Sequence, residues 1–181
     1  ALYVSAEESA SQVAGRAHRI FPEEKLSDMD FLSSGSLGKI MAQMTSGKYK
    51  LVVVDSIQTI FDDNLNSLPG SLTQIKACAS SLVSLAKQTD VILILVGHIN
   101  KDGNIAGPKA LEHLVDSVLQ LEGERSGQYR ILRSLKNRFG TTGEVGIFNM
   151  AEEGMRDVSP EDNVLAGSTE PEVGIAKTIA I

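Results

Sequence analysis

Three short, continuously apolar runs constrain the fold of this chain more than any other feature of its sequence. They are residues 2–4, 51–54 and 91–96. Runs of this kind are typical of strands that are covered on both faces of a parallel sheet. Apolar side chains at helical spacing lie between and around them, in residues 8–21, 36–45 and 71–87. The alternation of strands and helices predicts an α/β fold.

The second half of the chain has a different pattern. Strands are predicted at residues 117–122, 129–135 and 144–150, with turn-rich links at 123–127 and 139–143. Short links of this kind join antiparallel strands. The predicted architecture is therefore a mostly parallel central sheet flanked by helices, with antiparallel strands towards the C-terminus. Residues 172–181 are predicted to form a further strand or a loose end.

Composition excludes several classes of protein. Of the 181 residues, 42% are hydrophobic and 22% are charged, which is typical of globular domains and not of disordered chains. No apolar run approaches the roughly 20 residues that span a bilayer. The single cysteine, Cys78, excludes an internal disulfide and a cysteine-cluster zinc site within these residues. The net charge of -6 argues against a general nucleic-acid coat but leaves room for a local basic track.

Asp55 directly follows the apolar run 51–54, which is the form of a Walker B strand. Such a strand delivers one carboxylate to the carboxyl edge of the sheet, where ligands bind in open parallel sheets. There the carboxylate can hold Mg²⁺, directly or through water, beside nucleotide phosphates. The alternative is an Asp that caps a turn.

Glu7 and His98 follow the other two apolar runs in the same way. A carboxylate at a neighbouring strand tip can orient and deprotonate an attacking water, although Glu7 alone also fits a helix start, where acids favour the helix dipole. A polar residue at a third strand tip can sense a terminal phosphate, whereas a lone His is more often structural.

Lys136 and Arg138 lie two residues apart near the end of a predicted strand, so their side chains project to the same side. They can clamp a phosphate, either in cis or from a neighbouring subunit. A solvated basic turn is the alternative.

The segment Gly35-Ser36-Leu37-Gly38-Lys39-Ile40 is similar to a phosphate-binding loop. Its glycines are too close together, and Ile40 stands where the motif requires a hydroxyl residue. The segment also follows no clear strand in the sequence. We interpret it as an ordinary helix start, so the sequence contains no Walker A motif.

Six segments of this sequence occur together, and in the same order, in one known family. They are Tyr3-Val4-Ser5-Ala6-Glu7-Glu8-Ser9, Asp55-Ser56-Ile57-Gln58-Thr59, Val96-Gly97-His98, Ile105-Ala106-Gly107-Pro108-Lys109, Leu111-Glu112-His113 and Lys136-Asn137-Arg138-Phe139-Gly140. On these segments the chain resembles the bacterial RadA family, also called Sms, over about residues 2–165. The last segment is the hallmark of that family.

The resemblance implies a RecA-like P-loop ATPase core, related to the hexameric replicative helicases of the DnaB type, that uses ATP and Mg²⁺. It assigns the catalytic glutamate to Glu7 and the Walker B aspartate to Asp55. It places Ser56 and the sensor position, His98, among the nucleotide-binding residues.

The resemblance also implies that Lys136 and Arg138 reach the ATP of the adjacent subunit. Such a trans finger neutralises charge in the transition state. The expected assembly is therefore a homo-oligomeric ring, with a hexamer as the expected size.

The family's function implies an ATP-dependent motor that moves on single-stranded DNA and promotes branch migration of recombination intermediates, alongside the recombinase RecA. Two loops, 62–70 and 100–109, are expected to face DNA. Lys101 and Lys109 in the second loop are expected to track the phosphate backbone without reading bases. The expected location is the bacterial cytoplasm or a plant organelle, with no membrane partner.

The resemblance further implies that the chain is a piece of a longer protein. Residues 1–165 are expected to be a RecA-like ATPase domain without its first strand and Walker A loop, which would leave a gap or unpaired edges in the sheet. Residues 166–181 are expected to be a linker or the start of a Lon-protease-like domain, and zinc is expected only in a four-cysteine finger upstream. The chain alone is expected to be inactive. The alternatives are a RecA-like ATPase that acts on protein partners and a non-catalytic interaction module.

Overall fold

The computed structural model describes residues 1–21, 26–98, 108–123 and 128–158. The chain divides into two compact units, residues 1–117 and 118–181, and each is described here by itself. The predicted domain boundary at residue 165 and the predicted strand at 172–181 lie outside the described residues, so both stay predictions.

The first unit alternates strands with helices. In chain order its elements are β1 (Leu2–Ser5), α1 (Ala10–Ile20), β2 (Asp30–Ser33), α3 (Leu37–Thr45), β3 (Leu51–Asp55), the 3-10 helix η1 (Ile57–Thr59), α4 (Leu72–Thr89), β4 (Ile92–Val96) and α5 (Pro108–Leu111). Side chains fix the starts of the two longest helices. Ser9 and Gln12 form a capping box at α1, and Ser71 accepts a bond from the backbone N–H of Gln74 at α4.

The four strands of this unit form one parallel sheet in the order β2-β1-β3-β4. The sheet confirms the predicted α/β fold. β2 was not predicted, because only Phe31 and Leu32 of its four residues are apolar. It becomes a strand by pairing with β1, residue for residue, from Leu2 with Asp30 to Ser5 with Ser33.

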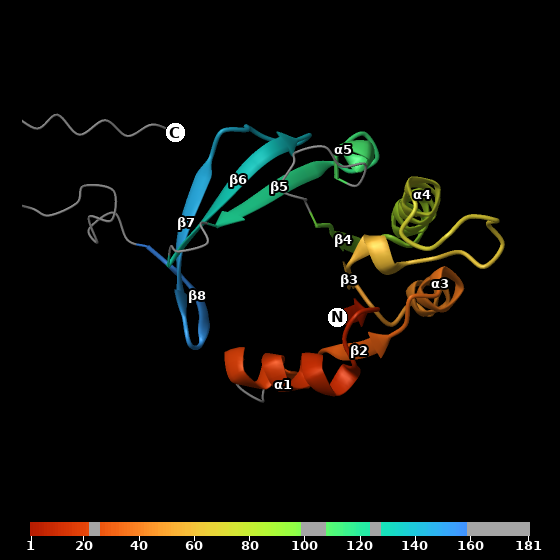
Figure 1. Ribbon diagram of the computed structural model, residues 1–181, viewed down its shortest axis with the longest axis horizontal. Helices are drawn as coiled ribbons and strands as arrows, with labels where there is room; N and C mark the ends of the chain where they lie inside the picture. The colour runs from red at the N-terminus through yellow and green to blue at the C-terminus, as the bar shows by residue number, and fades with distance from the viewer. Residues whose placement is uncertain (22–25, 99–107, 124–127, 159–181) are drawn as a thin grey trace, which may run out of the picture. The chain divides into compact units, whose positions relative to one another are not determined.

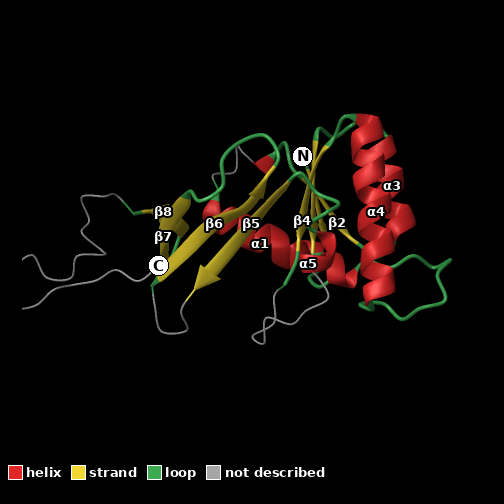
Figure 2. Ribbon diagram, turned by 90° about the horizontal axis from the view of Figure 1, so that it is seen from above, coloured by secondary structure: helices red, strands yellow, loops and turns green. Residues whose placement is uncertain are grey.

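Helices lie on both sides of this sheet and make three layers (Figures 1 and 2). α3 and α4 pack together on one side, and α1 contacts the β2 end of the sheet from the other. Because alternate residues of a strand face opposite sides, Val4 and Val54 point to the α3 and α4 layer while Tyr3 and Asp55 point away from it.

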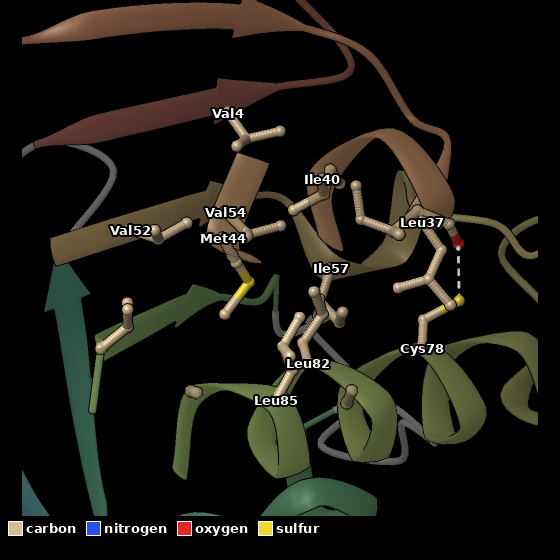
Figure 3. Packing of buried hydrophobic residues seen from close by; sticks show 14 of the residues in the cluster. Val4, Leu37, Ile40, Met44, Val52, Val54, Ile57, Cys78, Leu82 and Leu85 are labelled. Atoms are coloured by element: carbon tan, nitrogen blue, oxygen red, sulfur yellow. Dashed lines mark hydrogen bonds between the residues drawn. The ribbon is translucent and has the colours of Figure 1, made fainter. Parts of the chain in front are cut away.

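The core of the unit lies between the sheet and the α3 and α4 layer (Figure 3). In this close view, valines of β1 and β3 face side chains of α3 and α4. The labelled core residues are Val4, Leu37, Ile40, Met44, Val52, Val54, Ile57, Cys78, Leu82 and Leu85. The Cys78 thiol donates to the carbonyl of Ile60 at 3.8 Å, and burial raises the pKa of that thiol to about 11. Cys78 is thus a core residue held as a neutral thiol.

β4 is the edge strand of the sheet among the described residues, with β3 as its neighbour. Ile92 and Ile94 lie on the side away from α4 and are 65% and 47% exposed. Of the three strands predicted to be covered on both faces, β4 therefore keeps one face exposed. The four described strands pair without a gap between them, and the expected loss of a strand from this sheet stays a prediction.

The second unit is a four-stranded sheet in the order β5-β6-β7-β8. Its strands are β5 (Ser117–Gly123), β6 (Tyr129–Asn137), β7 (Val145–Ala151) and β8 (Gly154–Asp157). β6 pairs with β7 and β7 with β8 in antiparallel register, which confirms the predicted antiparallel strands towards the C-terminus. β8 was not predicted, because Met155 is its single large apolar residue.

The segment 35–40 starts helix α3, as the sequence indicated. The prediction that it follows no strand is wrong, because β2 ends at Ser33. Gly35 is required here by close packing, since a Cβ would lie 2.8 Å from the backbone oxygen of Thr59 and 3.1 Å from the ring of Phe61. The glycine thus serves the fold and not a phosphate.

Within the described residues, no helix is both long enough and apolar enough to cross a membrane.

Candidate active site

The carboxyl ends of β1, β3 and β4 meet at one edge of the parallel sheet. Ser5 pairs with Asp55, and Asp55 pairs with Val96, so the residues that follow these three strands are neighbours. This register brings together Glu7, Asp55 and His98, which the sequence placed at three strand tips. Edges of this kind are where open parallel sheets bind ligands.

Asp55 is the last residue of β3, and its carboxylate is held from the neighbouring strand. The phenol of Tyr3 donates to Oδ2 of Asp55 at 2.5 Å. Burial, and then this bond, raise the pKa of the Tyr3 phenol to about 12. Asp55 does not cap the following η1 helix, since Ser56 is at the capping position. The turn-capping alternative for Asp55 therefore finds no support.

Glu7, which follows β1, is held by the residue that follows β3. The hydroxyl of Ser56, which is fully buried, donates to Oε1 of Glu7 at 2.8 Å. Helix α1 begins only at Ala10, and its first turn contains no acidic residue. Glu7 is therefore directed at the strand tips and is not a helix-start acid. The predicted contact of Ser56 with nucleotide stays a prediction, and in this structure its hydroxyl orients Glu7.

His98 lies beside Glu7 at the same edge. Its Nε2 is 3.7 Å from Oε1 of Glu7, and the two side chains are 59% and 48% exposed. The side-chain amide of Gln58 donates to the backbone oxygen of His98 at 3.1 Å, which ties the end of β4 to the segment after Asp55. His98 is thus an exposed group at the site and not a buried structural histidine.

The donor set of this edge fits a magnesium ion and phosphates. Carboxylate oxygens are the protein ligands that Mg²⁺ prefers, and the ion usually keeps several water or phosphate oxygens as well. No cluster of three or more His, Cys, Asp or Glu side chains suited to a metal ion occurs in the part of the chain that the structure describes. The predicted role of Asp55, to hold Mg²⁺ directly or through water, therefore stays a prediction.

Lys136 and Arg138 lie in the second unit, in and just after β6. The side chain of Asn137 organises the turn between them and β7. Its Oδ1 accepts from the N–H of Phe139 at 3.2 Å, and its Nδ2 donates to the oxygen of Thr141 at 3.4 Å. Arg138 therefore lies at the start of a turn that Asn137 holds, while Lys136 still belongs to β6.

The predicted DNA-facing lysines are only partly described. Lys101 lies outside the described residues. Lys109 is the second residue of helix α5. Their contact with DNA stays a prediction.

The other predicted DNA loop, 62–70, is anchored by a residue that the sequence did not single out. Gln74 of α4 is buried, and its amide binds the loop backbone three times. Oε1 accepts from the N–H of Asp62 at 2.9 Å, and Nε2 donates to the oxygens of Asp62 and Ser67 at 3.1 and 3.0 Å. The loop is therefore pinned at two points to the helix beneath it.

Three further residues shape the site: Tyr3, Gln58 and Gln74. Tyr3 and Gln58 stand in segments that carry the family resemblance, but the sequence assigned none of the three a role. Each acts through a partner that is distant along the chain, so no local spacing marks it. The only available hint is that Tyr3 and Asp55 fall on the same side of strands predicted to be buried.

Comparison with known proteins identifies the family of this chain. No protein-family model matches the chain. It is 47% identical over 160 residues to the DNA repair protein RadA of Pseudomonas aeruginosa, a match that covers 88% of this chain and 35% of that protein. It is 43% identical over 180 residues to the DNA repair protein RadA of Helicobacter pylori, covering 99% of this chain and 40% of that protein. The chain belongs to the bacterial RadA family. It spans little more than a third of the length of these RadA relatives.

Solved structures place this RadA segment in the RecA-like fold. A DnaB-like replicative helicase matches 87% of the chain with a TM-score of 0.69 and 13% identity, over 50% of its own length. A KaiC-like protein of Pyrococcus horikoshii matches with a TM-score of 0.64 and 16% identity, over 74% of its length. A RadB recombinase matches with a TM-score of 0.57 and 21% identity, over 78% of its length. At these identities the likeness shows the fold alone.

Proposed function

We propose that this segment is the hydrolytic part of an ATP-driven DNA repair motor that acts on single-stranded DNA and promotes branch migration of recombination intermediates. One observation carries the proposal. Two carboxylates, Glu7 and Asp55, stand at the same sheet edge. Asp55 accepts from the hydroxyl of Tyr3 in β1, and Glu7 accepts from the hydroxyl of Ser56, the residue after β3. The chain that builds this edge is 41–47% identical to proteins named DNA repair protein RadA.

Glu7 acts as the general base. Its Oε1 is occupied by Ser56, and no described residue bonds Oε2, so that oxygen is available to orient and deprotonate a water. His98, at 3.7 Å from Oε1, is the group that senses the state of the site. Asp55 supports the magnesium ion, which neutralises phosphate charge when Mg²⁺–ATP is bound.

Lys136 and Arg138 complete the site of an adjacent subunit in a homo-oligomeric ring, for which a hexamer is proposed. A cation supplied in trans to a phosphoryl transfer makes hydrolysis depend on assembly. Lys101 and Lys109 are proposed to contact the DNA backbone, and branched DNA and the recombinase RecA are the proposed partners. The sequence identity supports this function over one on protein partners, because the KaiC-like match is at the level of fold alone.

A matched pair of adjacent glutamates tests the proposal. In the full-length protein, Glu7→Gln should keep nucleotide binding and lower kcat by about 10²- to 10⁴-fold, the usual contribution of a positioned base. Glu8→Gln is the control, since Glu8 pairs with Arg16 on the exposed side of α1. Both proteins are assayed with and without single-stranded DNA. Equal turnover of the two variants would show that Glu7 takes no part in the chemistry. If the wild type hydrolyses ATP but neither binds single-stranded DNA nor is stimulated by it, a function on protein partners would be favoured.

A further inference from the structure

Tyr3 occupies a special position relative to Asp55. β1 and β3 are parallel neighbours, with Tyr3 paired to Val53 and Ser5 paired to Asp55. Paired residues of neighbouring strands face the same side, so Tyr3 and Asp55 share the face opposite the α3 and α4 layer. The phenol reaches along this face, past one residue pair, and donates to Oδ2 of Asp55 at 2.5 Å.

The phenol is held in place independently of this bond. Its ring packs on the ring of Phe31 from β2, with 6.3 Å between centroids and a tilt of 54°. The ring contact therefore fixes the donor in place.

The bond makes the two carboxylate oxygens of Asp55 differ in their hydrogen bonding. Oδ2 accepts from Tyr3, and no described residue bonds Oδ1. Ser56 does the same for Glu7 in the opposite direction, since it occupies Oε1 and leaves Oε2. Tyr3 in β1 thus orients Asp55, and Ser56 just after β3 orients Glu7. Each carboxylate keeps one oxygen that no described residue bonds.

We propose that Tyr3 is a positioning residue for Asp55, which fixes the carboxylate so that Oδ1 is the oxygen available to a divalent cation. The role rests on the proposed ATP hydrolysis. A hydrogen bond from a hydroxyl to a carboxylate is a strong one, and without it Asp55 would rotate about its side-chain bonds. Removal of the outer partner of a metal ligand costs roughly 10- to 100-fold in metal affinity.

The chain offers a matched control for this bond. Tyr49 also donates from its phenol to an aspartate, Asp30, at 2.8 Å. Asp30 is the first residue of β2 and so lies at the amino end of the parallel sheet, opposite the site. Tyr49→Phe removes the same kind of bond without touching Asp55.

The experiment measures metal binding directly. Full-length wild type, Tyr3→Phe and Tyr49→Phe are titrated with Mn²⁺ in the presence of a non-hydrolysable ATP analogue, and free Mn²⁺ is followed by electron paramagnetic resonance. Tyr3→Phe should raise the Kd for Mn²⁺ by roughly 10- to 100-fold, and excess metal should restore kcat. Tyr49→Phe should match the wild type. Phe keeps the ring that packs on Phe31, so the fold is retained and is checked by circular dichroism.

Two results would overturn the proposal. A Kd for Tyr3→Phe within twofold of the wild type would show that the phenol does not position Asp55. An equal rise of the Kd for Mn²⁺ in Tyr3→Phe and Tyr49→Phe would show that loss of any such tyrosine bond weakens metal binding. If the wild type itself binds no Mn²⁺ with nucleotide, the proposed ATPase function fails, and that outcome is distinct from failure of the Tyr3 role alone.

Discussion

Replacement of Gln74 by Ala should release the loop 62–70 while the rest of the first unit stays folded. Gln74 is 2% exposed, and its amide makes three bonds to the loop backbone, two with Asp62 and one with Ser67. Gln74→Ala removes all three together. The oxygen of Asp62 keeps the N–H of Leu65 as a donor at 3.1 Å. The N–H of Asp62 and the oxygen of Ser67 lose their bonds to Gln74, and water replaces these when the loop opens.

The size of the effect follows from the number of bonds. A neutral hydrogen bond contributes about 0.5–1.5 kcal/mol net, so three bonds correspond to roughly 1.5–4.5 kcal/mol of the free energy that keeps the loop closed. Since about 1.4 kcal/mol is a factor of ten in an equilibrium constant, the open loop should become about 10- to 1,000-fold more populated.

Hydrogen exchange measures this population, because a backbone amide of the loop exchanges with solvent only when the loop opens locally. The amide of Asp62, which donates to Gln74, should exchange about 10- to 1,000-fold faster in Gln74→Ala. Amides in the middle of β3 should keep their protection. Gln88→Ala is the control, since Gln88 lies on the same helix, is exposed, and bonds only Ser84 at 3.3 Å in the described structure.

Gln74→Glu sharpens the test. It keeps an acceptor for Asp62 N–H but turns a second carboxylate oxygen towards the carbonyls of Asp62 and Ser67, so it should open the loop at neutral pH and close it partly on protonation. Unchanged exchange at Asp62 in both Gln74 variants would refute the view that Gln74 pins the loop. Loss of protection throughout β3 would refute the view that the loop opens by itself.

Three further outcomes are expected. Lys136→Ala or Arg138→Ala in the full-length protein should retain nucleotide binding and lose DNA-stimulated hydrolysis, by about 10³-fold or more for a trans finger, and wild-type turnover in either variant would end that role. Leu82→Ala should lower the free energy of unfolding by about 2–5 kcal/mol in urea titrations, because Leu82 is fully buried between α4 and the sheet; a loss below about 0.5 kcal/mol would contradict the packing. Hydrogen bonding from Lys48 lowers the pKa of Asp30, so its contribution to stability is present above the unfolded pKa of about 4 and is lost as pH falls through the lower folded value. Lowering the pH should therefore reduce the free energy of unfolding more in the wild type than in Asp30→Asn. Identical dependence of that free energy on pH in the two proteins would show that the Lys48–Asp30 pair does not stabilise the fold.

The sequence predicted the elements whose signal is local. β1, β3 and β4 were found because each is a continuous apolar run, and α4 because its apolar residues repeat at helical spacing from Leu72 onward. β2 and β8 were missed because each has four residues and few apolar ones. Such strands are defined by the partner they pair with, which no short window contains.

The residues of the site likewise divide into those that the sequence predicted and those that it did not. Glu7, Asp55 and His98 could be predicted because each directly follows a buried strand, and the carboxyl ends of parallel strands share an edge. Tyr3 could not be predicted, because its contact depends on β1 lying next to β3. Gln74 reads as an ordinary polar residue within a helix, and only the folded loop reveals its three bonds.

Because β1 and β3 pair in a fixed register, the packing of the hydrophobic core determines how the site residues are placed. Val4 and Val54 are paired and fully buried on the face opposite Tyr3 and Asp55, and their packing sets the register of β1 against β3. A slip of one residue would turn Tyr3 into the core and carry Glu7 past Ser56. The separation of the two carboxylates is therefore encoded by packing on the opposite face of the sheet. Mutational searches for altered turnover in this family should for that reason include core valines that never touch nucleotide.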